Sequence, residues 1–149
     1  MNFIIRNCKT EDLGKLVELC EKHALYEKAE YNPEKKSEQL EKAVFSDNPK
    51  LYCKIVEIEN QIIGYFSYTF DFSTWDAQIF LYLDCLYIEE NYRSIGIGKK
   101  IIEDLKIISK ENQCVNIQWQ TPIFNEKAIK FYKRNGAIGK DKIRFFLNE

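Results

Sequence analysis

Two hydrophobic periodicities alternate along the chain and predict a sheet with helices between its strands. Residues 79 to 88 are apolar at nearly every position, as expected of a central strand buried on both faces. From Ile97 to Lys110 the apolar residues instead recur at spacings of three and four, which is the pattern of an amphipathic helix. The expected strands are 3–6, 51–57, 62–70, 79–88, 115–119 and 143–147, and the expected helices are 10–21, 37–45, 97–110 and 125–135.

Turn-forming residues separate these elements. Glu59-Asn60-Gln61 predicts a tight hairpin, Thr10 is a candidate N-cap, and residues 26–36 read as a loop interrupted by Pro33. Residues 26–45 together are a candidate lid over a substrate. Strands come first and then alternate with helices, which indicates a three-layer α/β (α+β) domain with a mixed central sheet. We expect a single domain over residues 1–149.

A glycine-containing turn before the helix at 97–110 predicts a phosphate site. The run is Tyr92-Arg93-Ser94-Ile95-Gly96-Ile97-Gly98-Lys99. The first amide N–H groups of a helix have no partner within it, and together with the helix dipole they favour an anion, which glycine lets the backbone approach. A turn that only caps the helix is the alternative. The fingerprints of P-loop and dinucleotide-binding proteins are absent, since Lys100 follows Lys99 and Ile101 replaces the third glycine.

Composition restricts the class of protein further. The 149 residues contain no apolar run long enough to cross a membrane and no signal-peptide layout, so a cytoplasmic protein is expected. The five cysteines are scattered singly and are expected to be reduced and buried. His23 is the only histidine, which leaves no metal site to predict and disfavours a Ser-His or Cys-His nucleophile. A surface position on the first helix is expected for it, with a place in a substrate pocket as the alternative.

Charge is distributed in three blocks along the chain. Residues 1–54 hold ten basic and ten acidic side chains, residues 55–92 hold seven acidic and no basic ones, and residues 93–149 hold twelve basic and six acidic ones. A basic C-terminal part suits a polyanionic cofactor, and an acidic middle part suits a cationic substrate. The near-zero net charge gives no indication of nucleic acid binding.

Two motifs in order resemble the GNAT superfamily of N-acetyltransferases. Arg-x-x-Gly-x-Gly in the turn is followed by Asn125-Glu126-Lys127-Ala128-Ile129-Lys130-Phe131-Tyr132-Lys133-Arg134-Asn135-Gly136-Ala137. The chain looks closest to the diamine and polyamine acetyltransferases, because Tyr26-Glu27 after the first helix and the aromatic run Tyr68-Thr69-Phe70-Asp71 recur in that branch. The resemblance implies the GNAT fold and acetyl-coenzyme A as the acetyl donor.

The resemblance also implies which residues hold the cofactor. The pantetheine arm would pair with the main chain at the end of the central strand, and the pyrophosphate would lie on the amides of the turn. The last helix would contribute the remaining contacts, with an N-cap as an equal alternative for Asn125. The implied residues are Leu86, Tyr87, Ile88, Arg93, Ser94, Ile95, Gly96, Ile97, Gly98, Lys99, Asn125, Ala128, Tyr132 and Lys133.

Catalytic and substrate-binding roles follow from the same resemblance. Asp84, the one charged residue within the central strand, is expected to share a face with Tyr82 and Leu86 and to act as general base or amine anchor, with an ion pair to Lys or Arg as the alternative. Tyr132 would be the general acid toward the sulfur of coenzyme A, or else a core aromatic. Tyr26, Glu27 and Asp84 would bind the amine, and no covalent acyl-enzyme is required.

Three functions remain after these considerations. The first is transfer of an acetyl group to a primary amine of a small cationic molecule in a direct ternary complex. The second keeps the enzyme but changes the acceptor to an amino acid, an aminoglycoside or a protein N-terminus. The third is a non-catalytic module that senses acyl-coenzyme A. A homodimer, which is usual in the family, remains open beside a monomer.

Overall fold

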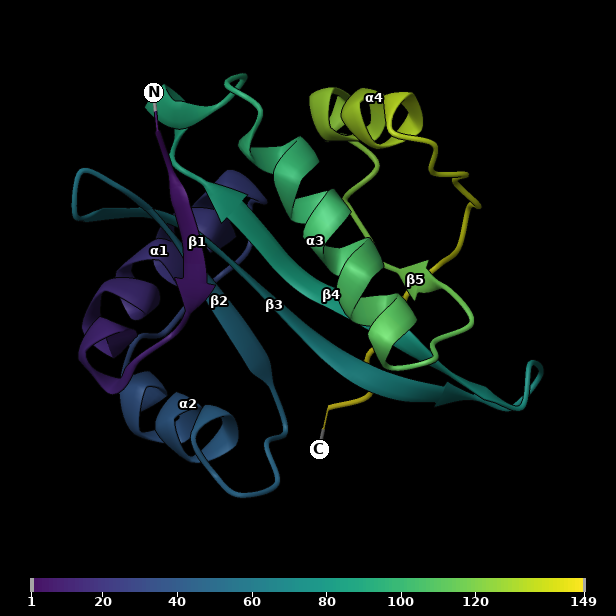
Figure 1. Cartoon of the computed structure of the whole chain (residues 1–149), viewed down its shortest axis with the longest axis horizontal. Coiled ribbons are helices and arrows are strands. Elements are labelled where there is room, and N and C mark those ends of the chain that lie inside the picture. The colour runs from purple at the N-terminus through teal and green to yellow at the C-terminus, as the bar shows by residue number, and fades with distance from the viewer. Residues whose placement is uncertain (1, 149) are drawn as a thin grey trace.

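The computed structural model describes residues 2–148, which contain one five-stranded sheet in the strand order β1-β2-β3-β4-β5 (Figure 1). The strands are β1 (Ile4–Asn7), β2 (Tyr52–Ile58), β3 (Gln61–Ser73), β4 (Gln78–Ile88) and β5 (Ile117–Gln118). The helices are α1 (Leu13–Tyr26), α2 (Lys36–Val44), α3 (Ile97–Glu111) and α4 (Glu126–Arg134), with 3₁₀ turns η1 (Thr10–Asp12) and η2 (Glu90–Tyr92). Strands β1 to β4 pair antiparallel and β5 joins β4 in parallel, so the sheet is mixed, as predicted. None of the described helices is both long and apolar enough to span a bilayer.

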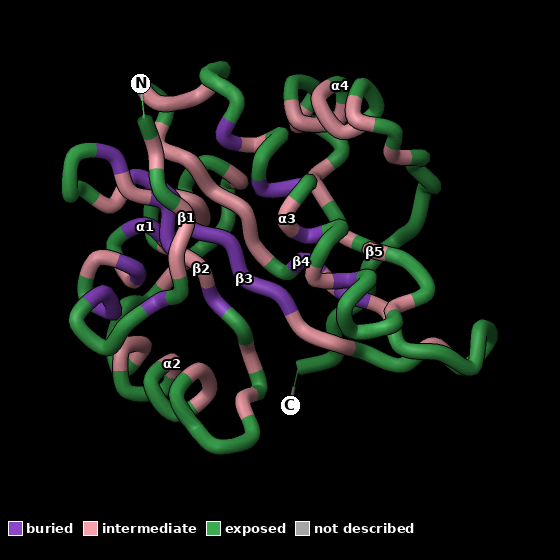
Figure 2. The backbone as a smooth tube through the Cα atoms, viewed as in Figure 1, coloured by how far each residue is buried: buried purple, intermediate pink, exposed green. Residues whose placement is uncertain are grey.

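Helices cover both faces of the sheet and create the three predicted layers (Figure 1). The leucines of α1 pack on one face, beside Ile55 and Tyr65, and the isoleucines of α3 pack on the other face around Phe66. Figure 2 shows the buried positions concentrated along the middle of β2 and β3, between these helices. The spacing of apolar residues therefore predicted the buried face of α3 correctly.

Local turn chemistry also behaves as predicted, with one exception at α1. The hairpin between β2 and β3 turns at Glu59 and Asn60, whose φ angles are +50° and +64°, as a two-residue turn of the favoured type requires. The first helix begins only at Leu13, after η1, and Asp12 rather than Thr10 stands at its N-cap position. The prediction that Thr10 caps the helix is wrong, because Thr10 begins a 3₁₀ turn that precedes α1 and leaves Asp12 at the N-cap position.

The predicted strand at 143–147 is also wrong. Residues 135–148 follow α4 without forming a helix or strand, and the side chains of Phe145 and Leu147 are 86% and 97% exposed. The strand expected at 115–119 shortens to the two residues of β5. Alternating apolar residues form a strand only where a neighbouring strand supplies backbone partners, and none of the described strands does so for this segment.

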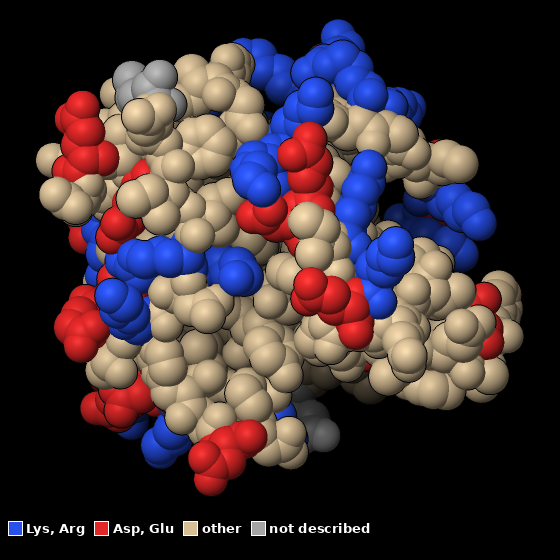
Figure 3. Space-filling model, in the orientation of Figure 1, with Lys and Arg blue, Asp and Glu red and all other residues tan. Residues whose placement is uncertain are grey.

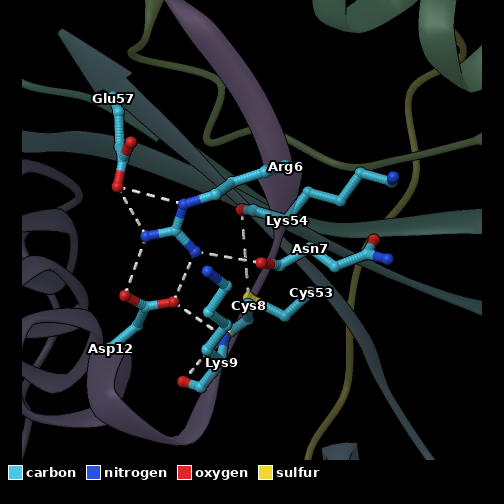
Figure 4. A network of polar contacts seen from close by, with 8 residues as sticks. All are labelled: Arg6, Asn7, Cys8, Lys9, Asp12, Cys53, Lys54 and Glu57. Carbon is cyan, nitrogen blue, oxygen red and sulfur yellow. Dashed lines mark hydrogen bonds and ion pairs between the residues drawn. The ribbon is translucent and has the colours of Figure 1, made fainter. Parts of the chain in front are cut away.

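A charge network fixes β1 to β2 and to the start of α1 (Figure 4). Arg6 on β1 donates to Glu57 on β2 at 2.6 Å and to both carboxylate oxygens of Asp12 at 2.7 and 2.9 Å. The backbone N–H of Lys9 donates to the same Asp12 at 2.7 Å. The hydrogen bonds from Arg6 hold the pKa of Asp12 below its usual value, so the carboxylate stays ionised.

Gly64 on β3 permits the close approach of the end of β4. A Cβ atom added there would lie 2.6 Å from Ile88 Cδ1 and 2.7 Å from the carbonyl oxygen of Tyr87. We predict that Gly64→Ala lowers the free energy of unfolding by about 1–3 kcal/mol, because a backbone carbonyl cannot move aside unless β4 shifts. Denaturant unfolding measures this effect. The control is Gly14→Ala in α1, where a Cβ would meet no atom within 4 Å and a gain of up to about 1 kcal/mol is expected. Similar effects at both sites would contradict the close-approach argument.

Candidate active site

A β-bulge at Asp84 organises the site. Cys85 lies opposite Ser67 and Leu83 lies opposite Tyr68, so Asp84 is an extra residue without a partner in the register of β3 and β4. On the other side, β4 pairs with β5 only at Leu81 and Tyr82. A bulge bends its strand and re-aims the side chains that follow. The second half of β4 therefore continues beyond the point where β5 stops pairing with it.

The bulge also changes which side chains share a face. Leu81 and Leu83 lie in the core under α3, and after the bulge Leu86 and Ile88 pack on that same core. Cys85 packs instead on the face covered by α1. The prediction that Asp84 shares a face with Tyr82 and Leu86 is therefore wrong, since the extra residue moves the alternation by one position.

Backbone groups near the end of β4 point toward the open side. The N–H of Glu89 donates to Ile63 on β3 at 2.8 Å. Backbone groups of alternate residues point to alternate sides of an antiparallel strand, so those of Leu86 and Ile88 point away from β3. The carbonyl oxygen of Ile88 accepts from Nε of Arg93 at 2.7 Å. The predicted main-chain positions thus lie on the edge that β5 leaves open.

Two residues with positive φ shape the turn before α3, where the sequence predicts a phosphate site. Gly96 has a φ of +92° and stands at the N-cap position of the 15-residue helix α3, and a Cβ added there would meet no atom within 4 Å. Ser94 adopts a φ of +66°, which costs a residue with a Cβ roughly 1–2 kcal/mol. Gly98 has a different purpose, because its added Cβ would lie 2.9 Å from the ring of Phe131 on α4. Gly98 therefore allows α4 to pack on α3, whereas Gly96 shapes the turn.

Basic side chains surround this turn. Figure 3 shows Lys and Arg gathered over α4 and the first part of α3. Their contributors are Lys99, Lys100, Lys127, Lys130, Lys133 and Arg134. Positive charge next to a helix N-terminus favours a polyanion such as a pyrophosphate.

Arg93, the leading residue of the motif, is directed toward aromatic rings. Its guanidinium lies 4.8 Å from the ring centre of Tyr26 and 5.5 Å from that of Tyr87. Tyr26 in turn donates its hydroxyl to Oδ1 of Asn125 at 3.1 Å. Arg93 therefore joins the C-terminal end of α1 to the end of β4.

Asn125 stands at the N-cap position of α4 but forms no side-chain cap hydrogen bond. Its amide nitrogen donates to Thr121 at 3.3 Å, and its oxygen accepts from Tyr26. The alternative prediction, that the Asn125 side chain caps α4, is therefore wrong. Asn125 instead connects the end of α1 and the loop that follows β5 to the start of α4.

Tyr132 on α4 is a half-buried phenol that stays protonated. Its ring packs edge-on against Trp119 with ring centres 5.2 Å apart. Burial, and then the nearby Glu27 and Tyr26, raise the pKa of Tyr132 to about 12. At neutral pH the hydroxyl can therefore donate a proton or a hydrogen bond. The structure brings Tyr132 to the same place as Glu27 and Tyr26, although these residues are distant in sequence.

His23 belongs to a polar cluster, so its predicted surface position is wrong. Its Nε2 lies 2.7 Å from the carboxylate of Glu27, its Nδ1 lies 3.0 Å from the hydroxyl of Tyr65, and its ring stacks on Tyr87 with centres 5.4 Å apart. A carboxylate only accepts, so Nε2 of His23 donates to Glu27. The sequence signal for this cluster is the i,i+4 spacing of His23 and Glu27 on one helix.

Asp84 lies exposed at the bulge, beside this cluster. The thiol of Cys85 lies 3.7 Å from its carboxylate, and Cys85 packs against the cluster that contains Tyr65. No ion pair within residues 2–148 involves Asp84, which contradicts the alternative that it pairs with Lys or Arg. Contacts through Cys85, Tyr65 and His23 thus connect Asp84 to Glu27. Within the same residues, no group of three His, Cys, Asp or Glu could hold a metal ion.

Known proteins share this fold and sequence. The acetyltransferase (GNAT) family matches residues 15–137, so the chain belongs to this family. Thialysine N-epsilon-acetyltransferase from Sus scrofa is 32% identical over 142 residues, covering 90% of this chain and 83% of that protein. Spermidine/spermine N(1)-acetyltransferase-like protein 1 from Homo sapiens is 28% identical, covering 91% of this chain and 20% of that longer protein. The solved structure of an aminoglycoside N-acetyltransferase in complex with CoA superposes with a TM-score of 0.81 at 15% identity and covers 99% of this chain and 95% of that one.

These matches confirm the family and the likeness to the diamine and polyamine branch. The chain is a GNAT-type N-acetyltransferase with acetyl-coenzyme A as its acetyl donor. The residues present fit that group, since the open space at Gly96, the N-terminus of α3 and the basic α4 suit a pyrophosphate. The outward-facing backbone of Leu86 and Ile88 suits an extended amide-containing arm.

Proposed function

We propose that this acetyltransferase acts on a primary amine of a small cationic molecule of the diamine or polyamine class. The observation that carries the proposal is the pair of carboxylates Glu27 and Asp84, which the contacts of His23 and Tyr65 hold on one side of the site. Asp84 belongs to the acidic block of residues 55–92, which contains no basic residue. The names of two relatives, a thialysine and a spermidine/spermine enzyme, point to the same class of substrate.

Two separated carboxylates match a molecule with two positive charges. An alkylamine has a pKa of about 10.4 and is an ammonium ion at neutral pH. One carboxylate can hold the ammonium group that does not react, while the other receives the reacting amine. We assign the first role to Glu27, whose carboxylate is oriented by His23, and the second to Asp84 at the bulge of β4.

Acetyl transfer requires a neutral amine, a polarised thioester carbonyl and a proton for the departing sulfur. Different residues of the site meet these three requirements. Bound acetyl-coenzyme A supplies the acetyl thioester. Asp84 accepts the proton that the ammonium group loses, directly or through water. The N–H of Leu86 points to the open edge of β4, where it can polarise a carbonyl oxygen. Tyr132 holds a proton on its hydroxyl for the departing sulfur.

Direct transfer, without an acyl-enzyme, is favoured by the state of Cys85. This is the cysteine next to Asp84, and burial raises the pKa of its thiol to about 12. A thiol with this pKa holds almost no thiolate at neutral pH, and the thiolate is the nucleophile. Cys85 therefore packs in the site and does not attack the thioester.

Thiol release from acetyl-coenzyme A with a panel of acceptors tests the substrate class. The panel contains spermidine, putrescine, lysine, thialysine, an aminoglycoside and a short peptide. Turnover limited to the small cationic amines supports the proposal. Turnover only with the peptide or the aminoglycoside would overturn the substrate class and keep the enzyme. Cofactor binding without turnover of any acceptor would favour a sensing role.

Replacing each carboxylate separately should give distinct kinetic results. We predict that Glu27→Gln raises KM for a diamine roughly 10-fold with a smaller change in kcat, because a charged contact to the distant ammonium is lost. Asp84→Asn should lower kcat by about 100-fold, because the proton acceptor is removed. Steady-state kinetics measure both. Asp71→Asn on β3 is the control, since this exposed acid only accepts from Thr69 at 3.1 Å. Unchanged kinetics in both site variants would refute the assignment.

A further inference from the structure

Two cysteines face each other across β1 and β2, outside the acetyl-transfer site. The register Arg6 to Ile55 and Asn7 to Lys54 continues to Cys8 and Cys53, and the N–H of Cys8 donates to the carbonyl of Cys53 at 3.0 Å. Both side chains are buried, at 7% and 6% exposure, and Figure 4 shows them next to one another. Residues opposite each other in a hydrogen-bonded antiparallel pair have Cα atoms about 5.5 Å apart. A disulfide needs about 4.4–6.8 Å, so this backbone can accept one as it stands.

The two thiols are chemically unequal. The interaction between the two neighbouring thiols lowers the pKa of Cys8 and raises that of Cys53. Burial and the negative charge of Asp12 raise the pKa of Cys8, the positive charge of Arg6 lowers it, and the neighbouring thiol has the largest effect. The thiolate is the reactive form, so we assign Cys8 as the nucleophile of the pair. Cys53 is then the resolving cysteine, which attacks the oxidised sulfur of Cys8.

A cavity gives small molecules access to this buried pair. It has a volume of about 250 Å³ and lies between the end of α2 and the strands β2 and β3. Cys8 and Cys53 both line it, together with Val44, Tyr52 and Tyr68. A molecule of hydrogen peroxide is only slightly larger than water, which occupies about 30 Å³ in the liquid.

We propose that Cys8 and Cys53 are a peroxide-sensitive thiol pair that oxidises to a reversible disulfide. The Cys8 thiolate attacks one peroxide oxygen, an S–O bond forms, the O–O bond breaks, and hydroxide leaves as water after taking a proton. Cys53 then attacks the sulfur of the Cys8 sulfenic acid, the S–S bond forms, and a second water leaves with the oxygen and the Cys53 proton. The two sulfurs lose two electrons and the peroxide gains them.

The disulfide would act on stability and leave the chemistry of acetyl transfer alone. It closes the chain from residue 8 to residue 53, a loop that contains α1, α2 and the site residues Tyr26 and Glu27. Such a link restricts the unfolded chain far more than the folded one. Oxidation should therefore raise the midpoint of thermal unfolding by about 5 to 10 °C while kcat at 25 °C stays the same.

Peptide mapping of the whole protein after treatment with hydrogen peroxide tests the pair without any mutation. The expected product has lost two hydrogen atoms, contains a Cys8–Cys53 linked peptide, unfolds at the higher temperature and returns to the starting mass with dithiothreitol. The competing pair is Cys20 and Cys85, which both pack against the cluster that contains Tyr65. A Cys20–Cys85 link, an intermolecular link or irreversible oxidation of Cys8 alone would each overturn the proposal.

Variants separate the two chemical steps. In Cys53→Ala the sulfenic acid on Cys8 should persist and react with dimedone, while in Cys8→Ala no dimedone adduct should form at Cys53. The matched control is Cys114→Ala, which leaves the pair intact and should give the same linked peptide as the natural sequence. A dimedone adduct on Cys53 in place of Cys8 would reverse the assigned roles, and none on either would refute the peroxide step. Should a variant fail to fold, the mapping of the natural protein still decides.

Discussion

Tyr132→Phe should lower kcat about 100-fold or more while KM for acetyl-coenzyme A changes little. The substitution removes only the hydroxyl, so the ring still packs edge-on against Trp119 and the position of α4 is kept. The physical reason for the loss is that a departing thiolate is stabilised by a proton donor, and burial keeps the Tyr132 hydroxyl protonated. Steady-state kinetics with the best acceptor of the panel measure the effect. Tyr52→Phe, at an exposed tyrosine stacked on Tyr68, is the control and should leave kcat unchanged.

The pH profile of kcat provides a second check on Tyr132. An unperturbed tyrosine titrates near pH 10, whereas the pKa of Tyr132 is raised to about 12. The protonated form therefore persists across the alkaline range, and kcat should not fall near pH 10 through loss of this proton. A fall near pH 10 that disappears in Tyr132→Phe would show an ordinary pKa. Normal turnover by the variant would remove Tyr132 from the mechanism.

Asp12→Asn should lower the free energy of unfolding by about 3 kcal/mol, the largest effect that we expect from a residue outside the site. The Asp12 side chain is 8% exposed and accepts from both terminal nitrogens of the Arg6 guanidinium. Its loss leaves a half-buried cation with Glu57 as its remaining carboxylate partner. Breaking one partner of a buried pair costs more than the pair itself contributes, because the remaining charge stays desolvated. Denaturant unfolding at pH 7 measures the loss. Kinetic constants of the folded enzyme should change little.

A surface ion pair of similar length is the matched control for Asp12. Lys100 and Asp104 on α3 are 2.6 Å apart, but the Lys100 side chain is 49% exposed and the pair is spaced i,i+4. Exposed helical pairs of this kind contribute about 0.3–0.5 kcal/mol, so Asp104→Asn should cost no more than that. Equal losses for the two variants would show that burial does not set the strength of the Arg6 network.

The effect of Asp12 should disappear in acid. The Arg6 hydrogen bonds lower the folded-state pKa of Asp12, while an unfolded aspartate has a pKa of about 3.9. A lowered folded-state pKa means that the stabilisation is complete above the unfolded value and is lost as pH falls through the folded one. The difference between natural protein and Asp12→Asn should therefore be constant above about pH 5 and shrink below about pH 4. A difference that grows in acid would contradict this assignment.

Most of the fold could be predicted because its signals are local. The spacing of Ile97, Ile101 and Leu105 identified the buried face of α3, and Glu59-Asn60 identified the turn between β2 and β3. A helix face depends on residues three and four apart, and a two-residue turn depends on its own dihedral preferences. The apolar alternation of 143–147 misled because it describes the segment and says nothing about whether a partner strand lies beside it.

In the candidate site, too, local features could be predicted and features that depend on distant residues could not. The turn that contains Gly96 and the family motif around Tyr132 were visible as short runs of sequence, and so was the acidic character of residues 55–92. The bulge at Asp84 was not visible, because one extra residue is defined only against the register of β3. The stacking of Arg93 on Tyr26 was hidden in the same way, since these residues are far apart in the chain.

The sequence by itself determined most of the helices and strands, the glycine-containing turn before α3, the family and the residue types of the candidate site. The tertiary structure decided which of those residues meet. It placed His23 between Glu27 and Tyr65, gave Gly98 a packing role against Phe131, and set Cys8 opposite Cys53. The reason is physical: strand register and helix packing minimise the free energy of the whole chain, and contacts between distant residues follow from that minimum instead of from any local pattern.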